Sequence, residues 1–339
     1  MTPDVSVCMP AHRDSPLLRR ALRSALEQTH DDLEVVVSDD SGGSLEPAVA
    51  AAADPRIRYF RNPEQLGFAR NHTTTVDRAE GRFIAFLHDD DRWLPGYLEQ
   101  SRRRFDADRS LGMVCTAYWL EREGDRLEPL PHPPPPGRHV DWLPLAIRHH
   151  TFIPSSTVLT RGLWEDVRRP WPEVVIGDLV LWIDAAVRGW PMYWESEPAV
   201  IYRYHADQIS ANEEDFRNAD VAVFESYRFP NPEWERLRRE RLAHAHIARA
   251  GIRLRVGEVA DAREDLRTAR RLAPARQRPR RIALSALARS PAALPLARAA
   301  RAALRRDRGP TSAQPGASGR PAERVTRFEP GAGANADRE

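Results

Sequence analysis

Short apolar runs alternate with amphipathic segments through the first hundred residues. Between two of these runs, Ser15 and Pro16 offer an N-cap and a first helical position, and the apolar side chains that follow share one helical face. The runs themselves are rich in β-branched and aromatic residues, which predicts buried strands at residues 5–9, 33–37, 57–60 and 83–87. Strands that alternate with helices at this spacing predict a parallel sheet with helices on both faces.

The pattern loosens after residue 110. Strands are expected at residues 113–120, 153–159 and 199–204, and a helix is expected at 179–187. A run of prolines that ends at Pro136 predicts an extended surface loop.

From about residue 234 the chain is rich in Arg and Ala and has a helical period. Residues 246–274 resemble one helical hairpin, with Gly257 in the turn. Beyond Arg308 the composition turns to Gly, Pro, Ser and Ala, which is typical of a disordered tail. The predicted organisation is an α/β domain at 1–228, with halves at 1–110 and 111–228, then a basic helical extension at 229–308 and a tail at 309–339.

Composition narrows the class of protein. The 339 residues are 41% hydrophobic and 29% charged, which allows a sizeable core and is unlike a disordered chain. No apolar run approaches the roughly 18–20 residues of a membrane span, and the first residues lack the basic and apolar segments of a secretory signal. The two cysteines are too few for a disulfide scaffold or a thiolate metal site. A cytoplasmic protein is expected.

All 51 cationic side chains are Arg, which excludes a lysine Schiff base and the lysine of a phosphate-binding P-loop. The net charge of +2 conceals an asymmetry, because residues 235–308 hold 21 Arg and only 7 acidic residues. Three interpretations of these basic helices stay open. They form an ordinary solvated face, or they lie peripherally on the inner face of an anionic membrane through an apolar stripe at 294–304. Binding of nucleic acid is the third, and the absence of stacking aromatic residues disfavours it.

Polar residues follow three of the predicted strands at the point where each strand ends, and ligands of a parallel α/β sheet bind outside these carboxyl ends. Three consecutive carboxylates, Asp89, Asp90 and Asp91, would repel one another by several kcal/mol in a partly dry cleft. A hard divalent cation such as Mg2+ or Mn2+ would relieve that repulsion. The alternative is a solvated acidic turn in which one Asp caps a helix and Arg92 neutralises another.

Two common nucleotide-binding motifs are missing. The chain has neither a G-x-x-x-x-G-K-[ST] loop nor a G-x-G-x-x-G motif after a strand. P-loop kinases and nicotinamide dehydrogenases are therefore poor interpretations. A site that binds a diphosphate through a metal ion and carboxylates suits a nucleotide whose diphosphate is the leaving group. Reactions of nucleotide sugars are of this kind.

Five sequence blocks stand in order at residues 5–10, 22–29, 34–41, 62–71 and 86–98. Together they make residues 4–110 resemble the N-terminal half of the inverting family 2 glycosyltransferases, and the resemblance continues more thinly to about residue 212. It implies the GT-A fold, an α/β Rossmann-like mixed sheet flanked by helices, which is followed here by a C-terminal α-helical extension. It also implies a hexosyltransferase-like enzyme that moves a sugar from a nucleoside diphosphate sugar to an acceptor hydroxyl with inversion, assisted by Mg2+ or Mn2+.

The resemblance assigns donor contacts residue by residue. Residues after the first two strands would meet the base and ribose, residues at the start of a later helix would line the nucleotide pocket, and the acidic turn and an arginine would meet the sugar diphosphate. The implied residues are Pro10, His12, Asp39, Asp40, Arg70, Asn71, Asp89, Asp90 and Arg203.

The acidic turn would supply the D-x-D element that holds the metal. The implied ligands are Asp89, Asp91 and His205, the last from a stretch at 202–210 that is similar to the family's Y-R-x-H-x-x-x-x-S element. The family often has Asp where His88 stands, so which of the three acids contacts the metal stays open. His205 is alternatively a hydrogen-bonded structural residue.

An inverting displacement needs a general base on the acceptor side. The family uses the Asp of a Glu-Asp pair before an apolar helix, which corresponds here to Asp178, although Gly177 replaces the Glu. Alternatively, Asp178 only caps the helix at 179–187.

The implied acceptor is a saccharide, a lipid-linked molecule or a small molecule. One rival function is a non-catalytic scaffold that keeps the fold and binds partners through its C-terminal helices, which the departures at His88 and Gly177 favour. Nucleotidyl transfer is a second rival, disfavoured because no Gly- and Arg-rich loop follows Val7.

Overall fold

A computed structural model describes residues 2–122, 126–148, 151–205, 208 and 212–289. All of them belong to one compact unit. The described part of the chain builds a ten-stranded sheet in the order β3-β2-β1-β4-β9-β6-β10-β5, with β7 paired to β6 and β8 paired to β10. The predicted tail and the apolar stripe at 294–304 lie outside the described residues.

The first four long strands form the parallel half of the sheet. They are β1 (Val5–Ala11), β2 (Leu33–Asp39), β3 (Ile57–Arg61) and β4 (Phe83–Phe86), and each is parallel to its neighbour. These are the four strands that the apolar runs predict. Their registers align Ala11 with Asp39 and Cys8 with Phe86, so the residues that follow β1, β2 and β4 share one edge of the sheet.

The other half of the sheet is mixed. The strand β9 (Thr157–Thr160) is antiparallel to both β4 and β6 (Met113–Arg122), and β10 (Met192–Arg203) runs parallel to β6. The short strands β5 (Arg92–Trp93), β7 (Arg126–Pro129) and β8 (Gly137–His139) pair antiparallel at the margins.

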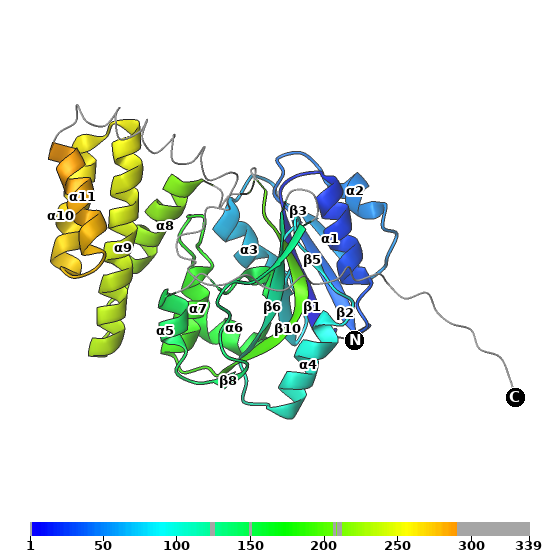
Figure 1. Ribbon diagram of the computed structural model, residues 1–339. Helices are drawn as coiled ribbons and strands as arrows, with labels where there is room; N and C mark the ends of the chain where they lie inside the picture. The colour runs from blue at the N-terminus through cyan, green and yellow to red at the C-terminus, as the bar shows by residue number, and fades with distance from the viewer. Residues whose placement is uncertain (1, 123–125, 149–150, 206–207, 209–211, 290–339) are drawn as a thin grey trace, which may run out of the picture. The chain divides into compact units, whose positions relative to one another are not determined.

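Helices cover both faces of the sheet (Figure 1). On one side lie α1 (Pro16–Leu26), α2 (Glu46–Ala50) and α4 (Tyr97–Ala107). On the other lie α3 (Phe68–Asp77), α5 (Leu143–Arg148), α6 (Arg161–Val167) and α7 (Leu179–Val187). The strand β1 serves both layers, since Val7 and Met9 enter the core under α1 and Cys8 enters the other core.

Two predicted strands differ from the observed ones. Residues Pro154–Ser156 form a short 3-10 turn before β9, because a proline has no N–H to give to a sheet ladder. The strand β10 begins at Met192, ahead of the expected residue 199. The register of β10 against β6 shifts between Glu195 and Val200, which interrupts the alternation of buried and exposed residues along the strand. The sequence pattern therefore does not show that β10 is one continuous strand.

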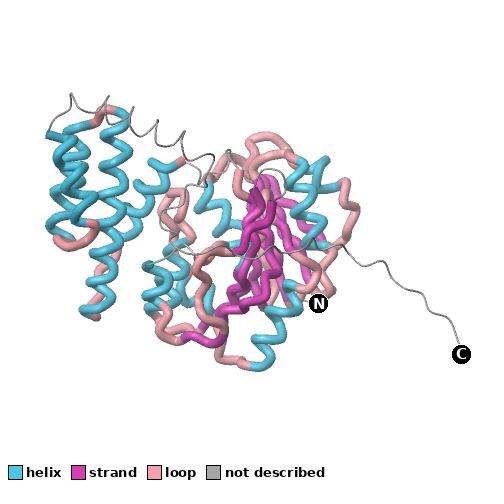
Figure 2. Tube along the Cα trace, viewed as in Figure 1, coloured by secondary structure: helices cyan, strands magenta, loops and turns pink. Residues whose placement is uncertain are grey.

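The C-terminal part of the described chain is all helical (Figure 2). It comprises α8 (Glu213–Glu225), α9 (Pro232–Val256), α10 (Val259–Leu272) and α11 (Arg278–Arg289). The predicted hairpin is α9 and α10, with Gly257 between them at φ 98°, a left-handed conformation that favours glycine. None of the helices among the described residues is long and apolar enough to cross a membrane.

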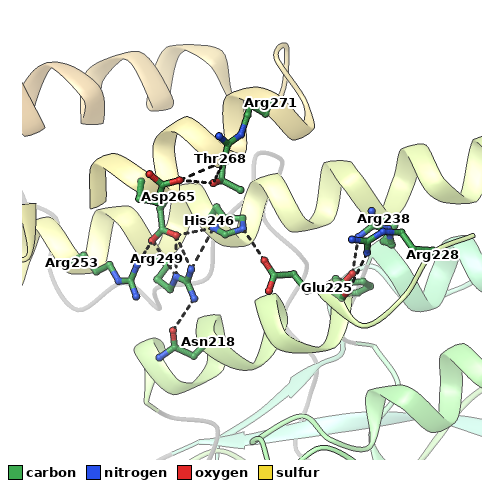
Figure 3. A network of polar contacts seen from close by, with 12 residues as sticks. Asn218, Glu225, Arg228, Arg238, His246, Arg249, Arg253, Asp265, Thr268 and Arg271 are labelled. Atoms are coloured by element: carbon green, nitrogen blue, oxygen red, sulfur yellow. Dashed lines mark hydrogen bonds and ion pairs between the residues drawn. The ribbon is translucent and has the colours of Figure 1, made fainter. Parts of the chain in front are cut away.

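One buried carboxylate joins α9 to α10 (Figure 3). Asp265 of α10 is 2% exposed and binds three side chains of α9: His246 at 2.7 Å, Arg249 at 2.7 Å and Arg253 at 2.9 Å. Burial alone would raise the pKa of Asp265, but these hydrogen bonds and charges lower it instead.

Candidate active site

The acidic turn after β4 is held by contacts from three other elements. His12, which follows β1, donates its backbone N–H to Oδ2 of Asp89 at 3.2 Å, and its ring Nδ1 lies 3.4 Å from the same oxygen. The hydrogen bond with Asp89 raises the pKa of His12. The end of β1 therefore carries a half-exposed imidazole beside the first of the three acids.

Asp91 is fixed on both of its oxygens. Ser155 donates its hydroxyl to Oδ2 at 2.5 Å, and the backbone N–H of Arg203 donates to Oδ1 at 3.0 Å. Asp91 is 2% exposed, so loss of hydration, together with the charge of Asp90, raises its pKa well above the usual range.

Asp90 lies on the partly exposed side of the turn and meets His205. The two side chains approach to 3.1 Å between Oδ2 and Nε2. Burial works against the charge of Asp90, but the hydrogen bond to His205 and the nearby imidazoles lower its pKa. The acidic turn and the segment after β10 thus meet, as the sequence predicts.

His88 faces this cluster from the residue before it. Its Nδ1 lies 3.9 Å from Oδ2 of Asp91, and its Nε2 lies 2.8 Å from Nε2 of His72 in α3. The other ring nitrogen of His72 contacts the carbonyl oxygen of Phe68 at 2.7 Å. Burial lowers the pKa of His72 to about 3 and lowers that of His88, so both rings are neutral near pH 7.

The donor set suits a divalent cation. Ligand atoms of His88, Asp90 and Asp91 lie within 4.8 Å of one another. Of the ligands that the sequence implies, Asp91 belongs to this group and His205 contacts its Asp90, whereas Asp89 contacts His12, which lies outside the group. An imidazole nitrogen and two carboxylates are a common set for Mn2+ and related cations.

Three of the residues that the resemblance assigns to the nucleotide, Asp39, Asp40 and Asn71, form hydrogen bonds within the protein around the site. Asp39 accepts hydrogen bonds from the backbone of Ser41 and Leu45 and from the hydroxyl of Tyr59. These bonds outweigh its burial and lower its pKa.

Asp40 and Asn71 are engaged in the same way. Asp40 binds the backbone N–H groups of Leu66 and Gly67 at 2.7 and 3.0 Å, which fixes the loop before α3. Asn71 is 4% exposed and bonds to Ser38 at 2.7 Å. Sequence motifs alone do not distinguish such internal partners from a ligand.

Three further residues that the resemblance assigns to the nucleotide sugar, Pro10, Arg70 and Arg203, differ in burial and in partners. Pro10 is buried in β1, and Arg70 is exposed at the start of α3. The guanidinium of Arg203 lies 3.1 Å from the buried Glu121, which Arg92 also contacts at 2.9 Å. Two arginines thus share one carboxylate beside the acidic turn.

Asp178 stands at the N-cap position of α7. Its side chain makes no capping hydrogen bond, and it is partly buried. Loss of hydration raises the pKa of Asp178 to about 7. A carboxyl group with such a pKa is suited to accept a proton near neutral pH.

Gly177 occupies a position with no room for a side chain. A Cβ atom there would lie 2.6 Å from the carbonyl oxygen of Pro172 and 3.6 Å from the Cβ of Ala69. From the same loop, Glu173 accepts the backbone N–H of Arg70 at 3.0 Å. The loop before α7 therefore lies against the first turn of α3, the helix that also carries His72.

Sequence reasoning missed two residues of the site, His72 and Ser155. Ser155 orients Asp91 with its hydroxyl and also accepts the backbone N–H of His88 at 3.1 Å. The signal for His72 was its place four residues after Phe68, on the buried face of a helix that carries a matched block. Ser155 gave no such signal, because its partner lies 64 positions away.

Known protein families and structures match this chain. The profile of glycosyl transferase family 2 matches residues 6–168. MT1568 of Mycobacterium tuberculosis is 43% identical over 122 residues, which are 36% of this chain and 38% of that protein. TuaG of Bacillus subtilis, named as a teichuronic acid biosynthesis glycosyltransferase, is 27% identical over 62% of this chain and 82% of its own length. The Campylobacter jejuni GalNAc(5)-diNAcBac-PP-undecaprenol beta-1,3-glucosyltransferase is 33% identical over 36% of this chain and 40% of its own length.

The chain thus spans about two fifths of the length of two of these relatives. Among solved structures, Staphylococcus aureus TarS in complex with UDP-GlcNAc has a TM-score of 0.64 at 15% identity, covering 85% of this chain and 88% of that one. The mannosyltransferase PcManGT of Pyrobaculum calidifontis, in complex with GDP-Man and Mn2+, has a TM-score of 0.56 at 19% identity, covering 91% and 82%. These likenesses confirm the predicted fold class.

Proposed function

Because residues 6–168 match the profile of glycosyl transferase family 2, we propose that this chain transfers a sugar from a nucleoside diphosphate sugar to an acceptor hydroxyl, with inversion and with the help of a divalent cation. One observation carries the proposal. Residues at the ends of β1, β4 and β10 meet at one edge of the sheet, where His12 contacts Asp89, His205 contacts Asp90, and the backbone N–H of Arg203 contacts Asp91.

The proposed reaction is a single displacement. The acceptor oxygen attacks the anomeric carbon and forms a new carbon–oxygen bond, while the bond from that carbon to the diphosphate oxygen breaks. The acceptor proton goes to Asp178, and the nucleoside diphosphate leaves with the electron pair of the broken bond. The raised pKa of Asp178 supports its role as the base, because such a group holds the proton near pH 7.

The leaving diphosphate needs positive charge. The cation would be held by His88, Asp90 and Asp91, and when bound it would neutralise charge that develops on the leaving oxygen. Arg203 and Arg92 would add charge from the protein side, since both share the single carboxylate of Glu121.

The acceptor is proposed to be a saccharide, and a lipid-linked one in the first instance. The Campylobacter jejuni relative is named for a diphosphoundecaprenol acceptor, and TarS is named in complex with UDP-GlcNAc. These names guide the choice of substrates for a test.

A non-catalytic scaffold receives little support from the departures that first suggested it. Gly177 stands where a side chain does not fit, which accounts for the missing Glu. His88 still presents a ligand atom to the acidic turn.

The experiment is a donor screen. The purified chain is incubated with UDP-, GDP- and dTDP-sugars, Mn2+ or Mg2+, and lipid-linked saccharide acceptors, and release of nucleoside diphosphate and glycosylated product are both measured. At least one pair should react, Asp91→Ala should abolish transfer, and Asp178→Asn should lower it by roughly 10²- to 10⁴-fold. The matched control is Asp106→Ala, at an exposed acid of α4 that should leave transfer unchanged. Full transfer in either site variant would overturn the assigned roles.

A further inference from the structure

We propose that His88 is itself a metal ligand through Nδ1, held in the required tautomer by His72, and that the site therefore prefers Mn2+ to Mg2+. This inference deepens the proposed function and rests on it for the presence of a cation. It concerns His88, which stands where the family often has Asp, and the buried His72, whose ring contacts that of His88.

The hydrogen-bond chain fixes which nitrogens carry protons. The carbonyl oxygen of Phe68 can only accept, so His72 must donate from Nδ1 across the 2.7 Å contact. His72 is buried among aromatic rings, where a cationic imidazole would be costly, so its Nε2 carries a lone pair. His88 must donate its Nε2 proton to that lone pair across 2.8 Å, which leaves the lone pair of His88 on Nδ1.

That lone pair is on the atom that faces the carboxylates. Nδ1 of His88 lies 3.9 Å from Oδ2 of Asp91, and His88 belongs to the group of three residues whose ligand atoms lie within 4.8 Å of one another. The separation of 3.9 Å is too long for a hydrogen bond, so Nδ1 of His88 and Oδ2 of Asp91 share no proton. Ligating histidines usually donate their other ring N–H to a fixed acceptor, and His72 is such an acceptor.

The residues around His72 hold the hydrogen-bonded series Phe68–His72–His88 in place. His72 is 3% exposed and packs against Phe68, Phe86 and Trp171, with ring centroids 4.3, 6.0 and 5.7 Å away. Neither ring can turn without breaking a buried hydrogen bond. The imidazole of His88 is therefore oriented before any cation arrives.

A nitrogen ligand changes the preference of the site. Mg2+ favours oxygen ligands and dehydrates reluctantly, whereas first-row transition cations accept imidazole readily. A site with Asp at this position would offer an oxygen ligand in place of this nitrogen.

The test is pulsed EPR of Mn2+ bound to protein that carries 15N-labelled histidine, with Mn2+ alone and with Mn2+ plus UDP or GDP. We expect a 15N coupling that is lost in His88→Asp and kept in His205→Gln. Competition with Mg2+ should show that His88→Asp has lost the preference for Mn2+. His72→Phe should weaken Mn2+ binding by about 10- to 100-fold, and His72→Gln, which keeps an acceptor, should recover most of it.

The matched control is His139→Gln, at a histidine of β8 whose ring contacts a loop carbonyl at 2.8 Å, and it should change neither Mn2+ binding nor the 15N coupling. Mn2+ that binds without nitrogen coupling, or with coupling that depends on His205 alone, overturns the inference and leaves the proposed function standing. Absence of Mn2+ binding under all conditions overturns it as well. Nitrogen coupling in a protein that transfers no sugar would keep the inference and reject the proposed function.

Discussion

The backbone N–H of Arg203 donates to Oδ1 of Asp91 across 3.0 Å, although the two residues are 112 positions apart in the chain. This contact joins the end of β10 to the turn after β4. It exists only once β6 and β9 have been placed between those strands in the sheet. The proposed catalytic centre is therefore assembled by both halves of the α/β domain.

The pH dependence of transfer follows from Asp178. A base must be ionised to accept a proton, and the pKa of Asp178 is raised to about 7 by burial. The rate should therefore fall as the pH drops below about 7 and reach a plateau above it. Asp178→Asn should lower kcat by roughly 10²- to 10⁴-fold and remove this limb of the profile. Steady-state kinetics from pH 5 to about 9 checks both.

The matched control for that profile is Asp184→Asn. Asp184 lies in the same helix but is bound to Arg169 and to the hydroxyl of Tyr227. Its removal should leave the shape of the pH profile unchanged. A wild-type rate that does not depend on pH across this range would contradict the role of Asp178.

Asp178 should also lower the stability of the protein at high pH. A carboxyl group whose pKa is higher in the folded than in the unfolded state binds more protons when folded. Stability is then lost as the pH rises from about 4, the ordinary pKa of Asp, to about 7. Asp178→Asn should raise the melting temperature at pH 8 and leave it nearly unchanged at pH 4, as measured by calorimetry. An equal shift at both values would show that the pKa is not raised.

The parallel half of the fold and the acidic turn could be predicted because their signals are local. Each apolar run from β1 to β4 is contiguous, and three consecutive acids begin three residues after the end of β4. The mixed half of the sheet was harder to predict from the sequence, because β5 pairs with β10, which lies about a hundred residues later in the chain.

The partners of the predicted site residues could not be read from the sequence either. Asp40 looks like a ligand-binding acid, yet it binds the backbone of Leu66 and Gly67. Ser155 has no motif, yet it orients Asp91. Such pairs are set by the packing of distant elements, which a single sequence does not encode locally.

Gly177 should resist replacement. A Cβ atom 2.6 Å from the carbonyl oxygen of Pro172 must displace the loop before α7, so Gly177→Ala should cost about 1–3 kcal/mol in the free energy of unfolding. Gly177→Glu, which restores the residue usual in the family, should lower transfer and not raise it. Gly162→Ala in α6 is the control, because nothing lies within 4 Å of its added Cβ. Denaturant unfolding measures both, and a gain of transfer in Gly177→Glu would refute the steric account.

The helical extension should depend on Asp265. Removal of a buried carboxylate that binds His246, Arg249 and Arg253 leaves cations without a partner, so Asp265→Asn should destabilise the protein by about 3 kcal/mol. Glu264→Gln, at the exposed neighbour, should change stability by less than about 0.5 kcal/mol. Because the folded state lowers the pKa of Asp265, its contribution should be present near neutral pH and lost in acid. Equal stability of the two variants in thermal unfolding would refute this role.

The measurement that bears most directly on the proposed centre is calorimetric titration of UDP, GDP and dTDP into the protein, with and without Mn2+. At least one nucleotide should bind with Mn2+ present and far more weakly without it, and Asp91→Ala should abolish the metal-dependent part. No binding of any nucleotide, or an affinity that neither Mn2+ nor Asp91→Ala alters, would contradict the account.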